Sequence, residues 1–433
     1  MNIWAYLRYK AVKDLFLPFF MRYLERGKKG PKKRPPSPPL NTNKNLKALI
    51  ASHYLLARYA EGAVPIAWVT SGAPVELLRA FGYYTLYPEN HSALCAAQKM
   101  GGSLCSFAEE RGYSKDLCSY AKIDLGVLFS GKTPVGRLPK PDLLFASNNI
   151  CQTVLYWYKE LAKAYSIPLI LFDTPFNYQA LRAEDLSYMV SQIHEIIHQL
   201  ERLTKKDFDP EIFSKALHFS KATCETWKEI LYCMQVVPAP ATIFDIFSHM
   251  LPVVSLRGLP VALRYYNLLL REFKQRINQK IAAVPNEKIR LLWDNIAIWY
   301  KMRELSNILI QHEANIVAAT YTNAWAETIP YMDPHNPIES IAKAYSLVIL
   351  NNNLKHRLNL IKKLVEEFKV QGIIMHSAKS CKPYSVGQYD IARILSTEYN
   401  IPCLILEADI ADERYYADEQ NKTKLEAFLE ALT

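Results

Sequence analysis

The sequence of 433 residues lacks a hydrophobic run long enough to cross a membrane. A membrane-spanning helix needs about 20 consecutive apolar residues. The N-terminal segment 2–26 is rich in large apolar side chains, but four charged residues and a proline interrupt it: Arg8, Lys10, Lys13, Asp14 and Pro18. This segment also lacks the small-residue cleavage site of a secretory signal. We therefore expect a helical arm here, in a cytoplasmic protein with no membrane span.

The body of the chain lacks net charge, although the whole sequence carries +10. Residues 1–47 hold twelve Lys and Arg against Asp14 and Glu25, and the remainder holds 40 residues of each sign. No nucleic-acid partner is therefore expected, because such binding needs a basic surface on the folded body. The Pro-rich basic segment 27–39, GKKGPKKRPPSPP, predicts a solvated linker or strap. Docking to an acidic partner or an anionic membrane is the alternative.

Cysteine pairs of the C-x-x-C type are absent, which argues against zinc knuckles. The eight cysteines are instead spread singly along the chain: Cys95, Cys105, Cys118, Cys151, Cys224, Cys233, Cys381 and Cys403. Without a secretion signal, and with half of the residues hydrophobic, disulfides are not expected. The reduced thiols are then either small buried side chains or metal ligands.

Strand-like apolar segments alternate with helical segments in two parts of the chain, as parallel sheets require. The expected strands are 65–70, 142–146 and 168–173 in the first part, and 315–320, 372–376 and 402–407 in the second. The last strands of the two parts are similar, SIPLILFD and NIPCLILE, which indicates a duplicated βα domain. Between the two parts, apolar residues recur at helical spacing, for example in LLWDNIAIWYKMRELSNILI, and predict a helical connector.

The predicted fold class is α/β, with two Rossmann-like doubly wound parallel-sheet domains, a helical N-terminal arm and a helical connector. The expected divisions are 1–62 for the arm and basic linker, 63–182 for the first sheet domain, 183–310 for the connector and 311–433 for the second sheet domain. Ligands bind such sheets at the carboxyl ends of the strands. DLLFASNNIC and GIIMHSAKSC both run from a strand to a cysteine, so we expect Cys151 and Cys381 to face a shared cleft.

Two short motifs match known patterns without the context that those patterns need. GVLFSGKT, residues 126–133, fits a phosphate-binding loop, yet a helix-like segment precedes it and prolines follow it. HEIIH, residues 194–198, fits the zinc-peptidase pattern, yet the apolar face of its helix excludes both histidines and no strong third-ligand motif follows. We therefore expect a flexible lid at the first motif and an ordinary helix surface at the second.

A set of longer motifs resembles the 2-hydroxyacyl-CoA dehydratase and benzoyl-CoA reductase superfamily over about residues 60–433. These motifs are SGAPVELLRAFGYYTLYPENHSALCAA, RGYSKDLCSYAKIDLG, PDLLFASNNIC, PLILFDTP, MHSAKSCKPYS and IPCLILEADIADERY. In that superfamily three cysteines hold a 4Fe-4S cluster between the Rossmann-like domains. The resemblance carries this role to Cys118, Cys151 and Cys381.

The surplus of cysteines is similar to that of the double-cubane cluster proteins in the same superfamily, homodimers with an 8Fe-9S cluster in each subunit. That resemblance implies six thiolate ligands, and we expect Cys95, Cys105 and Cys233 to complete the set. Cys224 is half a helical turn out of phase with Cys233, and Cys403 lies within a strand, so neither is expected to be a ligand.

Other residues beside these cysteines are candidates for roles around the cluster. Glu89 and His91 in YPENH could deliver protons, although both could equally be loop residues that face solvent. Hydrogen bonds to cluster sulfurs are expected from residues that flank the ligands, namely Asn148, Asn149, Lys379 and Ser380.

The resemblance implies a low-potential iron-sulfur oxidoreductase. A separate ATP-hydrolysing activator would supply its electrons, and a small molecule would be reduced at the cluster. One alternative is the 4Fe-4S subunit of an acyl-CoA dehydratase or aryl-CoA reductase, and another is a non-catalytic electron carrier. Roughly eight iron atoms per chain would favour the double cubane and roughly four the single cluster. A homodimer is expected for the first of these functions.

Overall fold

The computed structural model describes residues 2–26 and 37–433, so most of the predicted basic linker lies outside the described residues. Four parallel strands form the first sheet in the order β2-β1-β3-β4. Their bounds are β1 Ile66–Val69, β2 Tyr84–Leu86, β3 Leu143–Ser147 and β4 Leu169–Phe172. The predictions of β1, β3 and β4 are confirmed. The sequence analysis missed β2, because a strand of three residues is too short to show a period.

The second sheet repeats this order as β6-β5-β7-β8. Its strands are β5 Ile289–Asp294, β6 Ala314–Ala319, β7 Gly372–Ala378 and β8 Cys403–Ala408. Since both orders place the first and third strands of each set side by side, the predicted duplication of a doubly wound α/β unit is confirmed. Cys151 follows β3 and Cys381 follows β7, the matching strands of the two sheets.

The prediction of an entirely helical connector over residues 183–310 is wrong at its C-terminal end. Residues Ile289–Asp294 form β5, the strand at the centre of the second sheet, and all six are buried. The segment IRLLWD contains two charged residues, Arg290 and Asp294, which are buried in ion pairs with Glu287 and Arg357. It therefore shows neither a continuous apolar run nor a regular alternation that would predict a strand. Residues from 302 onward do form the expected helix, α14 Met302–Gln311.

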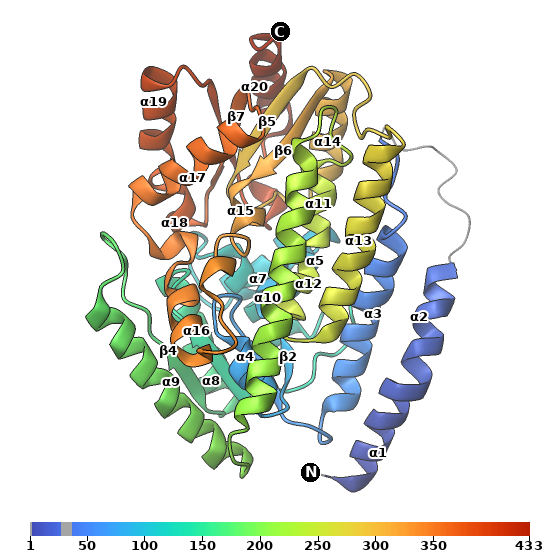
Figure 1. Ribbon diagram of the computed structural model, residues 1–433, viewed down its shortest axis with the longest axis vertical. Helices are drawn as coiled ribbons and strands as arrows, with labels where there is room; N and C mark the ends of the chain where they lie inside the picture. Colours follow the sequence, from blue (N-terminus) through green and yellow to red (C-terminus); the bar gives the residue numbers. More distant parts are fainter. Residues whose placement is uncertain (1, 27–36) are drawn as a thin grey trace.

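Helices cover both sheets and join them. Figure 1 shows the second sheet in the upper half of the molecule, the first in the lower half, and α10 running past both. The long helices between the two parts are α9 Ala183–Thr204, α10 Pro210–Tyr232 and α13 Pro260–Asn278. Shorter helices surround the sheets: α4 Val75–Ala80, α5 Pro88–Ala97, α6 Gly101–Glu109, α7 Ser119–Ser130, α8 Gln152–Tyr165, α11 Ile243–His249, α12 Leu251–Ser255, α15 Thr320–Asn323, α16 Pro337–Ser346, α17 Leu354–Glu367, α18 Lys382–Ser385, α19 Gln388–Glu398 and α20 Asp418–Glu430.

The N-terminal arm is helical, as predicted. It comprises α1 Ile3–Ala11, a π-helical turn Val12–Phe16 and α2 Leu17–Arg26, and it packs along α3 Asn43–Ala60 (Figure 1). Within the described residues, no helix is both long enough and apolar enough to cross a membrane.

Alternate residues of the first sheet belong to different cores. In β1, Ala67 and Val69 join the large core that also contains the second sheet and α10, whereas Ile66 and Trp68 join the core formed with α5 to α8. This division follows from the period of two in a strand, which sends successive side chains to opposite faces. The first core spans both sheets, so the two halves share buried surface.

The structure supports the rejection of both short motifs, but residues 126–130 are helical and not part of the expected flexible lid. Residues 126–130 of GVLFSGKT form the last part of α7, and Gly131 ends that helix with φ +68°. No helix begins at Lys132, so the amide geometry of a phosphate-binding loop is missing from this described segment. His194 and His198 are exposed on α9, and His198 Nδ1 lies 3.0 Å from Glu201 Oε2.

Candidate functional site

Three cysteines from separate loops line one cavity of about 120 Å³, here called the thiol cavity. Cys118 directly precedes α7, Cys151 directly precedes α8 and Cys381 directly precedes α18. The first two come from the first sheet domain and the third from the second. The expectation that Cys151 and Cys381 face a shared cleft between the domains is therefore confirmed, and Cys118 joins them there.

Each of these thiols sits at the N-terminal end of a helix. Gly, Pro and small polar residues around the cysteines end the preceding strand or turn, and a helix then begins at Ser119, Gln152 or Lys382. Free backbone N–H groups at a helix start favour a negative charge. The N–H groups of Ala121, Val154 and Tyr384 accordingly lower the pKa of Cys118, Cys151 and Cys381 respectively.

Burial acts more strongly and in the opposite direction on these thiols. It raises the pKa of Cys381 to about 12, and Cys151 nearby adds to the rise. Burial also raises the pKa of Cys151, and it raises that of Cys118 together with its neighbours Cys381 and Cys151. The thiols are therefore protonated at neutral pH without metal, and a metal that binds them would have to displace their protons.

The three thiols suit a cluster better than a single ion. Among the described residues, no three Cys, His, Asp or Glu side chains are arranged to hold one metal ion. A cubane of four iron atoms separates its thiolate ligands further than a single tetrahedral ion does, and thiolates are its usual ligands. Three reduced thiols around one cavity thus fit a 4Fe-4S cluster in which three of the four iron atoms would be bound by protein sulfur.

Glu89 also lines the thiol cavity. It lies in the first turn of α5, where Pro88 starts the helix, and its Oε2 accepts a 2.7 Å hydrogen bond from the backbone N–H of Ser71. Burial raises the pKa of the Glu89 carboxyl, while Ser71 acts against this rise. The carboxyl is thus placed to take up or release a proton inside the cavity.

Most of the remaining cavity wall is apolar or aromatic. The lining residues include Tyr120, Ile150, Val154, Trp157, Val254, Tyr321 and Trp325. Ser71 and Tyr321 had not been identified from the sequence as site residues. Both follow a predicted strand directly, and this position at a carboxyl end was the signal that could have found them.

His91 and Asn149, two of the predicted site residues, do not line the thiol cavity. His91 Nε2 lies 2.7 Å from Thr133 Oγ1, and burial lowers the pKa of His91 to about 4. Asn149 Nδ2 instead donates to the backbone oxygens of Gly72 and Tyr345.

The other three candidates for hydrogen bonds to the cluster also make different contacts. Asn148 Oδ1 accepts from the backbone and hydroxyl of Thr174. The ammonium of Lys379 lies over the Tyr415 ring, 3.9 Å from its centroid. Ser380 contacts Ser119. None of the three lines the thiol cavity.

The six thiols expected for a double cubane do not converge on the thiol cavity. Cys95 is buried beside His91, with 3.8 Å between Sγ and Nε2. Cys105 Sγ donates to the Ser119 carbonyl oxygen at 3.8 Å, and Cys233 lies in a turn after α10 beside Lys274 and Glu229. The reason is that α5, α6 and α10 direct these side chains into helix packing. Cys224 is buried, and Cys403 lies at the start of β8.

Two larger hollows adjoin the thiol cavity. The first hollow, of about 970 Å³, shares Asn90, Met250, Val254 and Tyr321 with it and extends to Lys47 and Arg58 on α3. The second hollow, of about 770 Å³, shares Ile150, Cys151, Ile349 and Leu350 with it. The two hollows have no lining residue in common, so they approach the cavity by separate routes.

Comparisons with known proteins identify the family. The chain is 33% identical over 395 residues to the (R)-2-hydroxyisocaproyl-CoA dehydratase alpha subunit of Clostridioides difficile, which covers 89% of this chain and 94% of that one. It is 31% identical over 402 residues to the (R)-phenyllactyl-CoA dehydratase alpha subunit of Clostridium sporogenes, covering 90% and 97%. A benzoyl-CoA reductase subunit of Thauera aromatica is 26% identical over 401 residues, covering 89% and 93%. These matches confirm the superfamily that the sequence motifs indicated.

The sequence profile of the 2-hydroxyglutaryl-CoA dehydratase D-component matches residues 70–432, which is nearly the whole body of the chain. The protein therefore belongs to the family of the 2-hydroxyglutaryl-CoA dehydratase D-component, whose members include the enzyme subunits named above.

Proposed function

We propose that this chain is the 4Fe-4S subunit of an enzyme that removes water from a 2-hydroxyacyl-CoA thioester. The observation that carries the proposal is the convergence of Cys118, Cys151 and Cys381 on one cavity. The names of the relatives, dehydratase alpha subunits among them, support this reaction over the double-cubane reduction favoured from the sequence. When bound, the cluster would supply single electrons at low potential.

The protein side chains would hold the acyl group beside the cluster and handle its protons. Glu89 is positioned to accept or donate a proton at the acyl chain, while the aromatic and aliphatic wall excludes water. Among the described lining residues of the thiol cavity there is no Lys, Arg or His. A second carboxylate on the substrate would be buried there without a cation, at high cost. The preferred acyl group is therefore apolar, either aliphatic or aromatic.

The first hollow suits the coenzyme A portion of the substrate. It is large, it opens into the thiol cavity beside Asn90 and Tyr321, and it carries the cations Lys47 and Arg58. Lys47 is exposed, so its ammonium is available to a phosphate group at the surface. The acyl end would then enter the thiol cavity while the nucleotide end stays near α3.

The second hollow suits the entry of electrons from a partner protein. It reaches Cys151 without passing through the first hollow, and exposed apolar side chains of Phe176, Leu354 and Val386 line it. A separate ATP-dependent iron-sulfur activator, as the superfamily resemblance implies, could approach the cluster there while substrate occupies the other route. Because the relatives are named as subunits, we propose that a second, different chain also takes part, instead of the homodimer expected from the sequence.

Removal of single cysteines tests the cluster directly. Cys151→Ala and Cys381→Ala should abolish brown absorbance and iron binding after anaerobic reconstitution, because no other described thiol lines the cavity to replace them. Cys403→Ala is the matched control, since this thiol lies on β8 away from the cavity and should leave the iron content unchanged.

The iron count separates the remaining functions. The proposal requires roughly four iron atoms per chain. Roughly eight would instead indicate a double cubane and would mean that further cysteines are ligands. Normal iron content in both Cys151→Ala and Cys381→Ala would refute the site altogether. If the cluster forms but the protein does not convert an acyl-CoA in the presence of a reduced activator, the result would favour the function of a non-catalytic electron carrier.

A further inference from the structure

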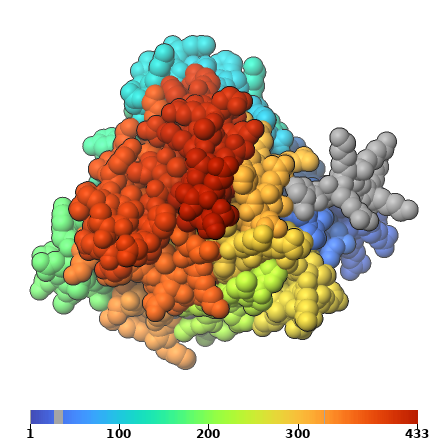
Figure 2. All heavy atoms as spheres, turned by 90° about the horizontal axis from the view of Figure 1, so that it is seen from above, coloured from blue at the N-terminus to red at the C-terminus, as the bar shows by residue number. Residues whose placement is uncertain are grey.

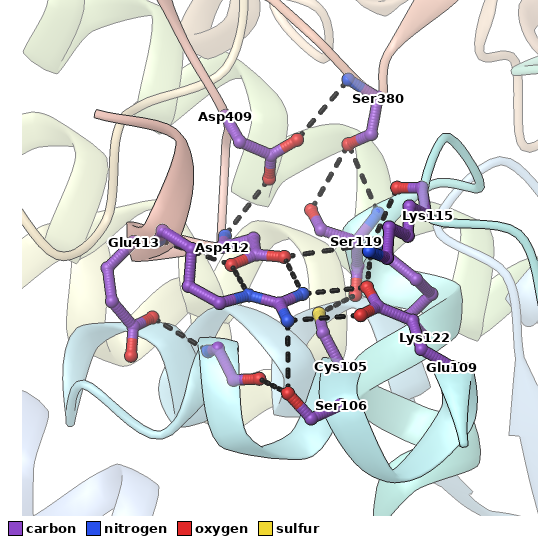
Figure 3. A network of polar contacts seen from close by, with 12 residues as sticks. Cys105, Ser106, Glu109, Lys115, Ser119, Lys122, Ser380, Asp409, Asp412 and Glu413 are labelled. Atoms are coloured by element: carbon purple, nitrogen blue, oxygen red, sulfur yellow. Dashed lines mark hydrogen bonds and ion pairs between the residues drawn. The ribbon is translucent and has the colours of Figure 1, made fainter. Parts of the chain in front are cut away.

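A polar network connects the two sheet domains immediately beside two of the cavity thiols. Ser119 follows Cys118 in the first domain, and Ser380 precedes Cys381 in the second. The backbone N–H of Ser119 donates to Ser380 Oγ at 3.1 Å, and the two hydroxyl oxygens lie 3.3 Å apart. Figure 3 shows both serines between the two domains. One pair of contacts thus joins the chain positions next to both thiols.

Asp409 extends this connection to the loop after β8. Its Oδ2 accepts from the backbone N–H of Ser380 at 3.2 Å (Figure 3). Its Oδ1 accepts from the backbone N–H groups of Ala411 and Asp412 at 2.9 and 3.0 Å. The Asp409 carboxylate therefore holds the 409–412 loop in a turn and fixes that turn to the residue before Cys381.

A buried ion pair connects the 409–412 loop to Lys122 on α7. Asp412 lies 3.6 Å from the ammonium of Lys122, and both side chains are almost fully buried. Lys122 follows Ser119 by three residues on α7, so both lie on the same side of that helix. The contacts consequently form a closed ring from Ser119 through Ser380, Asp409 and Asp412 to Lys122.

Two further charges balance the ring. Glu109 on α6 lies 2.9 Å from Lys122 Nζ and accepts from both terminal nitrogens of Arg414. Arg414 also pairs with Asp412 at 2.6 Å. Among Lys122, Glu109, Arg414 and Asp412, each domain supplies one cation and one carboxylate, so each of these four has a partner of opposite sign. Asp409 accepts from backbone N–H groups instead. Lys122 and Asp412 are the buried pair of this set, whereas Arg414 is partly exposed. Separation of the two domains would therefore leave buried charges unpaired.

Close backbone packing surrounds the same contacts. A Cβ atom on Gly101 would lie 1.8 Å from the carbonyl oxygen of Ala411, so only glycine allows α6 to approach this loop. The neighbouring Gly102 N–H donates to Glu413 Oε2 at 2.8 Å. Figure 2 shows the outside of this junction, where the cyan segment around α6 lies against the red C-terminal part of the chain.

We propose that Ser119, Ser380, Lys122, Asp409 and Asp412 form an interdomain latch that sets the separation of Cys118 and Cys381. The inference rests on the proposed function, since that separation matters because the two thiols would hold one cluster. These are positioning residues, because they act through the backbone beside the thiols. Loss of the latch would leave all three thiols present but let the second domain shift relative to the first.

Two variants test the latch. Ser380→Ala removes the hydroxyl contact and keeps every charge, whereas Lys122→Met removes the buried cation of the ring and leaves Glu109 and Asp412 paired with Arg414 alone. The matched control is Lys99→Met, because Lys99 pairs with Glu304 of the second domain at 3.9 Å but at an exposed position. Both latch variants should release iron to a chelator at least several-fold faster than wild type and should alter the electron paramagnetic resonance spectrum of the reduced cluster. Lys99→Met should match wild type in both measurements.

A measurement on the metal-free protein separates failure of the latch from failure of the proposed function. A short bifunctional thiol reagent should couple Cys118 to Cys381 in wild type, with a lower yield in Ser380→Ala, as mass spectrometry of the linked peptides can show. Unchanged coupling, spectrum and iron release in Ser380→Ala would overturn the latch, even if Lys122→Met proved unable to fold. If the reagent couples Cys118 to Cys381 in wild type but the protein binds no iron, the proposed cluster would be refuted and the latch would still stand.

Discussion

Glu89 is the carboxylate that shares the thiol cavity with the three cysteines. Its environment is suited to proton exchange, because burial raises its pKa while the Ser71 N–H holds one oxygen in place. A general acid or base works best when its pKa lies near the operating pH. His91, two residues later on the same helix, points to Thr133 and is neutral at physiological pH.

Glu89→Gln should therefore lower kcat by roughly 10²- to 10⁴-fold, the usual effect of losing a general acid or base. Glutamine keeps the size of the side chain, so iron content and the spectrum of the reduced cluster should not change. His91→Gln is the matched control and should retain most of the turnover. Steady-state kinetics of the anaerobically assembled enzyme provide the measurement. A wild-type kcat in Glu89→Gln would show that the Glu89 carboxyl takes no part in the reaction.

Helix α7 carries a cavity thiol at its start and an uncompensated carboxylate in its interior. Asp124 is almost fully buried, and its Oδ2 accepts a 2.8 Å hydrogen bond from Trp157 Nε1. Burial raises the pKa of Asp124 to about 7, and the Trp157 hydrogen bond only partly offsets this rise. In the unfolded chain the same carboxyl would have a pKa near 3.9, so folding favours its protonated form.

The stability of the metal-free protein should therefore fall as pH rises between the unfolded and folded pKa values of Asp124. The folded state binds the proton more tightly in this window, which gives a negative slope, and the loss is complete above about pH 7. Asp124→Asn should remove this dependence, and its stability advantage should grow by up to about 4 kcal/mol between pH 4 and pH 9. Urea unfolding at both pH values measures it, and a constant difference would contradict the assignment.

The molecule as a whole leaves two separate routes to one buried site. The carboxyl ends of the strands in both sheets lead to the thiol cavity, and helices fill most of the space around it. The first and second hollows lie on different sides of the thiols. Under the proposed function, a long substrate and an electron-donating protein would therefore reach the thiols by different routes.

The first hollow allows a test of which route the substrate takes. Lys47→Ala should raise KM for an acyl-CoA by up to about 5-fold, on the scale of an exposed ionic contact, and should leave kcat nearly unchanged. An acyl-pantetheine lacks the nucleotide phosphates, so its KM should be equal in Lys47→Ala and wild type. Lys163→Ala on α8, outside both hollows, serves as the control. If the KM for the acyl-CoA were the same in Lys47→Ala and wild type, the nucleotide end of coenzyme A would not bind near Lys47.

The sequence alone was sufficient for features that depend on local pattern. Apolar runs bounded by Gly and Pro identified six of the eight strands, and their recurrence identified the duplication. The failures were β2, which is too short to carry a period, and β5, in which the buried charges Arg290 and Asp294 interrupt the apolar run. The missing sequence context of GVLFSGKT was also a sufficient reason to reject a phosphate-binding loop there.

The positions of Cys151 after β3 and of Cys381 after β7 were likewise predictable, because each is a property of neighbouring residues. Only the tertiary structure decided which thiols share a cavity. Cys95 and Cys105 are close to Cys118 in sequence, yet helix packing directs them away, while Cys381 arrives from more than 200 residues later. The same long-range packing made Ser380 a partner of Ser119. Such contacts depend on how two separately encoded sheets dock, which no local spacing determines.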